Sequence, residues 1–519
     1  MKISIIQNNP KTGDFESNLS AIMKAIADAG RQGADIIVAP EYALTGPNPK
    51  DLLRRENFFI EAENALKQLA SMNIDAPIII GTLIKEDDCV YDAAAVVDGG
   101  RLEFIKKSVV SYDEAYYIDT EEKDGFCTIR GKNVLIMLGS EAELDYLFEA
   151  KPDLAINISA RNYTRGIISK DLKSLSAAAK RHGVMLISAN LCGGNDENIC
   201  YGASAVFAPD GKVLAEAGAF EEDLINVDTD KVEPSSLEER DDTADLVAAL
   251  TLGLGDYFCK QNFGKAVIGL SGGIDSAVVA ALAARAVGGE NVLGVMMPSE
   301  YTSDESIKEA KELAENLKMP YRVVPVKNIF NAFVNEIKPA AEPDKVSLTL
   351  QNLQSRSRGV ILMALSNEEN RLVLATGNKS EVAMGYCTLY GDTVGAVDPI
   401  ADLLKTEVYE VARYINRRKE IIPEGTITRA PSAELKPGQK DEDELPPYEK
   451  LDQIVRLYLE ENKTSEELIE AGFDKDMVNK AVRRIEINEY KRRQLPMGLK
   501  ISECTFFLDR KMPLVRKAL

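Results

Sequence analysis

Histidine and tryptophan are almost absent from this sequence of 519 residues, which contains one histidine, His182, and no tryptophan. Mechanisms of the Ser-His-Asp or Cys-His kind need an imidazole base, so they are disfavoured. The seven cysteines are scattered and none forms a CxxC pair, which argues against a disulfide framework and against a zinc site. A long apolar run that would indicate a transmembrane helix or a signal peptide is also missing. These absences predict a soluble, cytoplasmic protein.

Positive charge is scarce too, because 62 basic residues stand against 83 acidic ones and give a formal net charge of −21. Such a field repels nucleic acid and anionic membranes, so neither is an expected partner. Many proteins are acidic for solubility alone, and this is the simpler explanation of the charge. An anionic substrate would have to be bound by local donors.

Two large domains are expected, since the chain is too long for one ordinary core. Residues 1–230 alternate short apolar strands with amphipathic helices, which predicts an α/β layered domain. Residues 231–245 are polar and acidic, and they are predicted to form a linker. Residues 246–519 return to alternating strands and helices. This pattern predicts a doubly wound parallel sheet of the Rossmann-like kind, with ligands at the carboxyl ends of its strands.

The strongest motif is SGGIDS at residues 271–276, between an apolar strand and an alanine-rich helix. Gly272 and Gly273 let the backbone curl so that its N–H groups point into a concavity, and the helix N-terminus adds positive charge. Such a turn suits a pyrophosphate, although it is not a Walker A loop. An acid at Asp275 is tolerated beside phosphates only with a cation, which predicts bound Mg²⁺. An ordinary Gly-Gly turn with capping residues is the alternative, and the complete string weighs against it.

This string resembles the pyrophosphate loop of the N-type ATP pyrophosphatases, which use ATP to adenylate a carboxylate or carbonyl oxygen. The resemblance implies that Asp275 and Lys405 are catalytic. It also implies an ATP site formed by Gly269, Leu270, Ser271, Gly272, Gly273, Ile274, Asp275, Ser276, Thr376, Lys405 and Ser432.

Other segments narrow the resemblance to the NAD⁺ synthetase branch of that family. They are QNLQSRSRG at 351–359, TGNKSE at 376–381, GYCTLYGD at 385–392, PIADLLKTEVY at 399–409, PSAELKPGQ at 431–439 and NEYKRRQ at 488–494. The resemblance implies that the metal is shared by Asp275 and Glu381. It further implies contacts to deamido-NAD from Asn352, Arg356, Arg358, Glu381 and Lys491. For Arg358 and Lys491, a solvated helical face is an open alternative, and Gln351 departs from the glutamate usual in the family.

The reaction implied by this resemblance is ATP-dependent amidation of deamido-NAD to NAD⁺. The nicotinate carboxylate is adenylated with release of pyrophosphate, ammonia attacks the adenylate, and AMP leaves. Water must be excluded from the intermediate. The polar residues 431–448 are the candidate lid.

The first half carries PEYALTG at 40–46, GGNDE at 193–197 and YGAS at 201–204, which resemble the nitrilase (carbon–nitrogen hydrolase) family. The resemblance implies an α-β-β-α sandwich and a Glu-Lys-Cys triad. Glu41 stands at the glutamate position, and either Lys106 or Lys107 supplies the lysine, with Lys107 preferred. No cysteine stands at the nucleophile position, which falls on Gly139 without a gap or on Ser140 with a one-residue slip.

The favoured hypothesis is therefore an NAD⁺ synthetase that uses free ammonia, with Glu41 and Lys107 as vestiges of a retired amidase. One alternative is a fully glutamine-dependent synthetase with an unusual nucleophile such as Ser140. Another is a different adenylating amidotransferase or a tRNA-modifying enzyme, and a third is a non-catalytic nucleotide-binding protein. The resemblance also implies a homo-oligomer, at least a dimer through the second domain.

Overall fold

The chain forms two compact units, Met1–Asp245 and Leu246–Leu519. This computed structural model describes residues 1–111, 114–121, 125–143, 145–339 and 346–517. The predicted linker at 231–245 lies inside the first unit: Ser235 exchanges backbone hydrogen bonds with Val213, and helix α4 (Asp242–Lys260) begins within it. Within these described ranges, no helix is both long and apolar enough to cross a membrane.

The described residues of unit 1 form two six-stranded sheets and one hairpin. The first sheet has the order β14-β1-β2-β3-β4-β5 and the second has the order β13-β12-β9-β8-β7-β6. The strands are β1 (Lys2–Gln7), β2 (Ile36–Val38), β3 (Ile78–Glu86), β4 (Cys89–Asp98), β5 (Arg101–Lys106), β6 (Phe126–Ile129), β7 (Lys132–Leu138), β8 (Leu154–Ser159), β9 (Leu186–Asn190), β12 (Ala205–Phe207), β13 (Val213–Glu216), β14 (Asp223–Asp228), and the hairpin β10 (Cys192–Asn195) with β11 (Asn198–Tyr201). The helices are α1 (Phe15–Arg31), α2 (Glu56–Ala70) and α3 (Ile167–His182), with short 3₁₀ turns at Lys50–Arg54, Glu114–Tyr116, Glu141–Glu143 and Asp145–Phe148.

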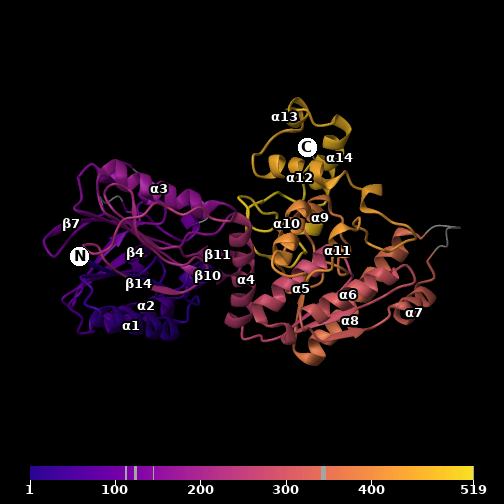
Figure 1. The fold of residues 1–519 in the computed structure, drawn as a ribbon, viewed down its shortest axis with the longest axis horizontal. Helices are drawn as coiled ribbons and strands as arrows, with labels where there is room; N and C mark the ends of the chain where they lie inside the picture. Colours follow the sequence, from indigo (N-terminus) through magenta and orange to yellow (C-terminus); the bar gives the residue numbers. More distant parts are fainter. Residues whose placement is uncertain (112–113, 122–124, 144, 340–345, 518–519) are drawn as a thin grey trace. The chain divides into compact units, whose positions relative to one another are not determined.

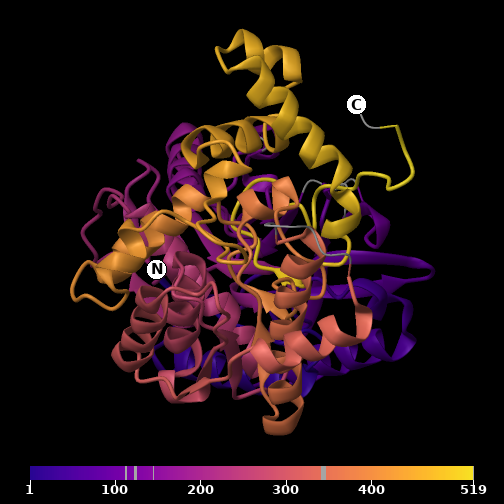
Figure 2. The same cartoon turned by 90° about the vertical axis from the view of Figure 1, so that its right-hand side faces the viewer.

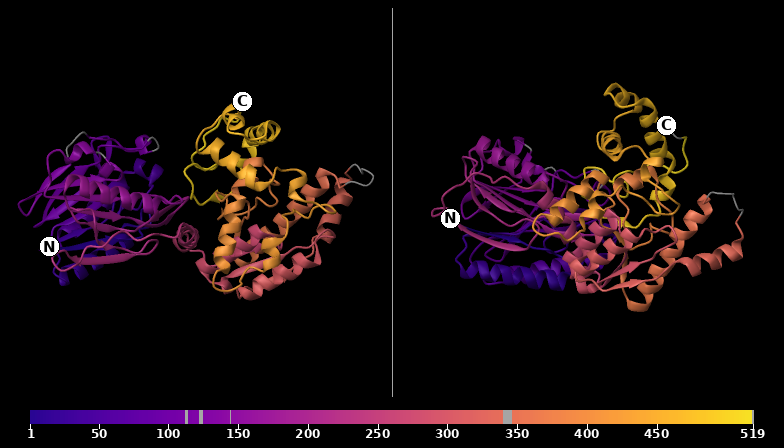
Figure 3. Two further views of the ribbon diagram at one scale, coloured as in Figure 1. Left: turned by 45° about the horizontal axis from the view of Figure 1, so that its top comes forward. Right: turned by 45° about the vertical axis from the view of Figure 1, so that its right-hand side comes forward.

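The core of unit 1 lies between the two sheets, because alternate side chains of each strand point inward. Ile5 and Val38 of the first sheet pack in one cluster with Ile136 and Ile156 of the second. Helices α1 and α2 bury their apolar stripes on the outer face of the first sheet, and α3 lies against β9 and β12 of the second. Figure 1 and the right panel of Figure 3 show these layers within unit 1. The predicted α-β-β-α sandwich is confirmed.

Unit 2 is built on one parallel sheet with the order β17-β16-β15-β18-β19-β20. Its strands are β15 (Ala266–Gly269), β16 (Val292–Met296), β17 (Tyr321–Val323), β18 (Leu372–Leu374), β19 (Val397–Asp398) and β20 (Met497–Gly498). After α4, its helices are α5 (Ile274–Val287), α6 (Asp304–Asn316), α7 (Lys327–Ile337), α8 (Leu348–Glu369), α9 (Lys379–Met384), α10 (Lys405–Asn416), α11 (Glu424–Thr428), α12 (Tyr448–Leu459), α13 (Ser465–Glu470), α14 (Lys475–Ile487) and α15 (Glu489–Arg492), with 3₁₀ turns at Gly289–Asn291 and Asp441–Asp443. The predicted parallel sheet is confirmed.

The strand order of unit 2 reverses beside β15, which positions the site. From β15 the chain moves outward through β16 to β17, and it then returns to the other side of β15 to form β18. Ligands of doubly wound sheets bind in the crevice outside the carboxyl ends of the strands at such a reversal. The loops that follow β15 and β18 therefore meet there.

A second core joins α9, α12 and α14 at the C-terminal end of unit 2. Figure 2 shows the yellow helices of this region grouped together at one end of the unit. At its base the fully buried Lys379 ammonium lies 2.9 Å from Glu460 Oε1, 3.0 Å from Asp402 Oδ1 and 2.7 Å from Ser502 Oγ. These partners satisfy the buried charge of Lys379, and through Ser502 they join α9 to the C-terminal segment.

Candidate functional site

The SGGIDS loop has the tight curl that its glycines predict. Gly272 has φ +82°, and a Cβ there would lie 2.4 Å from the backbone oxygen of Ser306, so only glycine fits. The Ser271 hydroxyl accepts a hydrogen bond from the N–H of Gly273 at 3.1 Å and lies 3.1 Å from the Ser276 hydroxyl. The loop is therefore pre-shaped at the N-terminus of α5, where backbone N–H groups favour an anion.

A cavity of about 300 Å³ opens beside this loop. We call it the loop cavity. All predicted ATP-binding and metal residues line it, namely residues 269–276 together with Thr376, Glu381, Lys405 and Ser432, and so does Arg358. The predicted residues thus converge from segments more than 150 positions apart.

The charged centre of the loop cavity is Lys405. Its ammonium lies 2.5 Å from Asp275 Oδ2 and 3.3 Å from Glu381 Oε1, and Asn378 Nδ2 donates to Asp275 Oδ1 at 2.9 Å. Burial alone would lower the pKa of Lys405, but the two carboxylates raise it above its ordinary value. Burial raises the pKa of Glu381 to about 8, partly offset by Lys405. Because two acids share the single Lys405 cation, a second positive charge would stabilise the site.

Three residues predicted to touch deamido-NAD do not line the loop cavity. Lys491 Nζ donates to the carbonyls of Gly385 and Cys387, each at 2.8 Å. Arg356 donates to the Leu389 carbonyl at 3.1 Å, and Asn352 accepts from the Thr388 hydroxyl at 2.9 Å. All three side chains instead hold the GYCTLYGD segment, which itself borders the cavity.

Several residues that line the cavity were not singled out from the sequence. Asp398 ends the two-residue strand β19 and accepts from the Gly377 N–H at 3.1 Å. Asp441 accepts from the Tyr448 hydroxyl at 3.0 Å, and Arg429 donates to the Gly272 carbonyl at 3.0 Å. Asp441 lies in the acidic run 441–444 inside the candidate lid, which is the only sequence signal that points to any of them.

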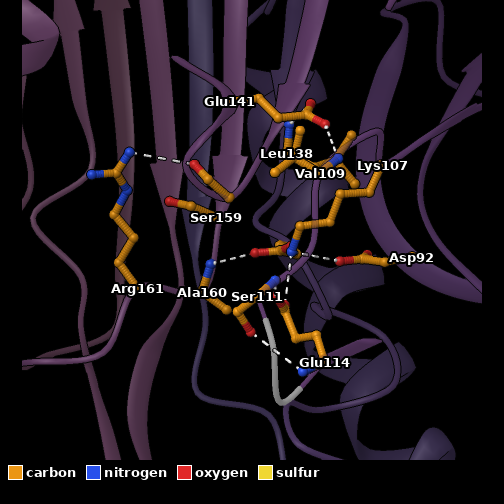
Figure 4. A network of polar contacts seen from close by, with 12 residues as sticks. Asp92, Lys107, Val109, Ser111, Glu114, Leu138, Glu141, Ser159, Ala160 and Arg161 are labelled. Carbon is orange, nitrogen blue, oxygen red and sulfur yellow. Dashed lines mark hydrogen bonds and ion pairs between the residues drawn. The ribbon is translucent and has the colours of Figure 1, made fainter. Parts of the chain in front are cut away.

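Unit 1 holds a second polar centre, the Lys107 cluster, composed of Glu41, Asp92, Lys107 and Glu114. The Lys107 ammonium lies 2.8 Å from Glu41 Oε1, 3.4 Å from Asp92 Oδ2 and 2.8 Å from Glu114 Oε1. Figure 4 shows it pointing between Asp92 and Glu114. Lys106 instead pairs with Glu86 at 2.6 Å. Of the two candidate lysines, Lys107 is therefore the one that meets Glu41.

The end of β7 faces this cluster at Gly139. An added Cβ at Gly139 would lie 3.2 Å from Lys107 Nζ and 3.7 Å from Glu41 Oε1, whereas Ser140 is exposed. Cys127 is packed in the core between the sheets, where burial raises the pKa of its thiol to about 12. Glu141, which the sequence did not single out for a role, accepts from the Leu138 N–H at 2.9 Å and fixes this strand end.

Charge in the Lys107 cluster is unbalanced, since three carboxylates surround one ammonium. Oxygens of Glu41, Asp92 and Glu114 all lie within 4.8 Å of one another. Burial and the Glu41 carboxylate raise the pKa of Asp92 well above its ordinary 3.8. The folded state therefore keeps a proton on Asp92 that the unfolded chain loses near pH 4. Between pH 4 and the raised pKa of Asp92, the free energy of unfolding falls as the pH rises.

We expect Asp92→Asn to stabilise unit 1 at high pH, because the amide imitates the protonated acid without titrating. The gain should be larger near pH 9 than near pH 6, because the cost of retaining the proton in the folded state grows with pH until the raised pKa of Asp92 is reached. Hydrogen exchange of peptides from β3–β5 under urea would measure it. Asp98→Asn, at the partly exposed end of the same strand, is the control. A variant less stable than the wild type at both pH values would contradict the assignment of a proton to Asp92.

Comparison with known proteins matches both units. Residues 246–495 match the family model "NAD synthase", and residues 2–118 and 156–235 match "Carbon-nitrogen hydrolase". The glutamine-dependent NAD(+) synthetases of Synechocystis sp. and Thermotoga maritima are each 37% identical to this chain, over 99% and 100% of it and 98% and 99% of their own lengths. A solved glutamine-dependent NAD⁺ synthetase from Acinetobacter baumannii, in complex with ADP, is 32% identical with a TM-score of 0.79, and the match covers 100% of this chain and 99% of that one.

The two family matches define a ligase of the NAD synthase class, joined to a unit of the carbon–nitrogen hydrolase family. The chain belongs to the two-domain NAD⁺ synthetase family. The predicted family and the predicted enzyme class are confirmed. For the nitrogen donor, the names of the relatives favour the glutamine-dependent alternative over the ammonia hypothesis.

Proposed function

We propose that this chain uses ATP to adenylate the nicotinate carboxylate of deamido-NAD and then replaces AMP with a nitrogen nucleophile to form NAD⁺. The observation that carries the proposal is the meeting of Asp275, Glu381 and Lys405 beside the SGGIDS loop in one cavity. A pre-shaped turn at a helix N-terminus supports binding of a pyrophosphate. The cation and acids beside it support the displacement at phosphorus.

Mg²⁺ is the proposed metal, held by Asp275 and Glu381. Both carboxylates already reach one cation, the Lys405 ammonium. Mg²⁺ commonly binds through one or two carboxylates together with substrate phosphates and water, and the donor set of this cavity fits that pattern. When bound, the ion would neutralise charge on the phosphates.

The protein residues would then act by position and charge. Lys405 would neutralise negative charge that develops as pyrophosphate departs. The Ser271 hydroxyl and the N–H groups at the start of α5 would hold pyrophosphate oxygens. Residues of the candidate lid that border the cavity would keep water from the mixed anhydride. We also propose a homo-oligomer formed through unit 2, which is supported by exposed Phe333 and Ile337 on α7 and Val360 and Met363 on α8.

The nitrogen donor has two candidates, each favoured by a separate observation. The names of the relatives favour glutamine. The residues of this chain favour free ammonia, because the backbone position that faces Lys107 and Glu41 is Gly139, which carries no nucleophilic atom. A thiolate is the usual nucleophile beside such a glutamate and lysine, and an alcohol would be far weaker. We therefore propose ammonia as the donor and treat glutamine as the alternative.

Donor choice can be measured with ¹⁵N-ammonium and with amide-¹⁵N-glutamine, each supplied with ATP and deamido-NAD. We expect label in NAD⁺ from ammonium and none above background from glutamine. Gly139→Cys should raise glutamate release above the wild type, since it adds a thiol next to Lys107, and Ser140→Cys is the matched control. Stoichiometric glutamate formation by the wild type, lost in Ser140→Ala, would establish the glutamine-dependent alternative. Absence of NAD⁺ with either donor would refute the proposed reaction itself.

A further inference from the structure

The middle of the candidate lid is tied down by Glu434. This residue lies in the irregular stretch between Pro431 and the 3₁₀ turn Asp441–Asp443, and it borders the loop cavity. Its backbone has φ +49°, a left-handed conformation that side chains other than glycine adopt at a cost. Such a conformation persists when surrounding contacts determine it. The side-chain contacts of Glu434 therefore help to hold this stretch closed.

Those contacts come from the N-terminus of α6, on one wall of the cavity. Glu434 Oε1 lies 3.0 Å from the hydroxyl of Ser303 and 3.0 Å from that of Ser306. Ser303 is the N-cap of this 13-residue helix, and its hydroxyl accepts from the N–H of Ser306. A carboxylate at the positive end of a helix is stabilised both by the dipole and by the hydrogen bonds. The Glu434 carboxylate of the candidate lid is therefore the anion at the N-terminus of α6.

The same hydrogen-bond network reaches the ATP loop. Arg429 Nη1 donates to the Ser306 hydroxyl at 2.8 Å, and its Nη2 donates to the Gly272 carbonyl at 3.0 Å. Glu434 is therefore joined to the glycine turn through two intermediates, Ser306 and Arg429. Any opening at Glu434 breaks a connected network rather than one isolated bond.

The neighbouring residue of the lid is held from another wall. Gln354 of α8 donates to the Leu435 carbonyl at 3.1 Å, while the Leu435 N–H donates to Gln439 Oε1 at 2.9 Å. Helix α6 thus binds Glu434, and helix α8 binds the adjacent Leu435. Glu434 supplies the charged contact of the two, so its removal should loosen the lid most.

We propose that Glu434 is a latch that holds residues 431–440 closed over the adenylated intermediate and so limits its hydrolysis. This inference rests on the proposed function. In the side reaction, water attacks the carbonyl carbon of the mixed anhydride, the bond to the phosphate oxygen breaks, and AMP leaves with the electron pair. The water proton passes to solvent and the free carboxylate returns. Each such event consumes ATP without making NAD⁺.

The test is the ratio of AMP to NAD⁺ formed, with saturating ATP and deamido-NAD at high and at limiting ammonium. The wild type and the control Glu442→Gln, an exposed acid of the 3₁₀ turn that follows the stretch, should give a ratio near one at high ammonium. Glu434→Ala should raise the ratio at least about threefold, and more when ammonium is limiting. A position that served only the stability of the fold would lower both products together and leave the ratio unchanged.

Ser303→Ala loosens the same contact from the opposite side and serves if Glu434→Ala does not fold. A ratio equal to that of the control in whichever of these variants folds would overturn the latch. Loss of AMP formation in a folded Glu434→Ala protein would also overturn it, because Glu434 would then act in adenylation. Failure of the proposed function has a different result, since the wild type would then form no AMP.

Discussion

Asp275→Ala is expected to lower the rate of ATP-dependent pyrophosphate release by roughly 10²–10³-fold, the usual cost of removing one preorganised electrostatic contact from an active site. The carboxylate accepts from Asn378 at 2.9 Å and pairs with Lys405 at 2.5 Å within the phosphate-binding turn. Without it, a metal ion at this turn loses one of its two proposed ligands. Pyrophosphate release would be followed across Mg²⁺ concentrations, with deamido-NAD as the acceptor.

Asp476→Ala is a suitable control, because that acid is exposed on α14. The Asp275 variant should melt close to the wild type, since Lys405 retains Glu381 as a partner. A rate within about threefold of the wild type at every Mg²⁺ concentration would remove Asp275 from the metal site. A rate restored only by high Mg²⁺ would indicate weaker metal binding with the remaining ligand.

Lys405→Met is the second change with a large expected effect. Methionine nearly preserves the length of the side chain but leaves Asp275 and Glu381 facing each other without a cation. The pKa of Glu381, already raised to about 8 by burial, should rise further. We expect the maximal rate to fall by roughly 10²–10³-fold, because the charge that develops on the leaving pyrophosphate loses its counter-ion.

Single-turnover formation of AMP, measured from about pH 6 to about pH 9, would test this prediction. The matched control is Lys436→Met, whose ammonium pairs with Glu444 at 3.1 Å and does not line the loop cavity. If Lys405→Met kept the maximal rate and raised only the KM for ATP, Lys405 would serve binding and not the chemical step.

Residues inside one contiguous motif were the easiest to predict, because their chemistry is fixed by their own neighbours. Asp275 needed only the glycine turn around it to be assigned to a cation. The pairing of Lys405 with both Asp275 and Glu381 could not be read in the same way. Those contacts join positions 24 and 130 residues apart, and only the folding of the sheet brings them together.

Asn352, Arg356 and Lys491, whose roles are implied by resemblance, hold a segment that borders the loop cavity. Each of these side chains bonds to the GYCTLYGD segment, because the hydrogen-bonding groups of that turn need partners wherever they are shielded from water. A polar residue in a motif can support the wall of a site as readily as it can enter the site. Their contact with deamido-NAD stays a prediction.

Strands β19 and β20 were beyond sequence reasoning for a different reason. Each has two residues, too few to show an alternating pattern, and each is defined by its pairing with a neighbour. In unit 1 the sequence leaves open, for a related reason, whether Lys106 or Lys107 is the lysine that meets Glu41. Adjacent residues of a strand point to opposite faces, so a one-residue uncertainty in register exchanges them.

The pairing of β20 with β19 has a consequence for how the protein is made on the ribosome. Met497 lies beside Val397, and buried Lys379 depends on Ser502 for one of its hydrogen bonds. The sheet of unit 2 therefore lacks its last strand until residues 497–498 have been synthesised. Unit 1 closes once β14 reaches β1, at residues 223–228. During translation β14 can therefore pair with β1 while β19 is still an unpaired edge of the unit 2 sheet, and an unpaired strand edge is open to pairing with another chain.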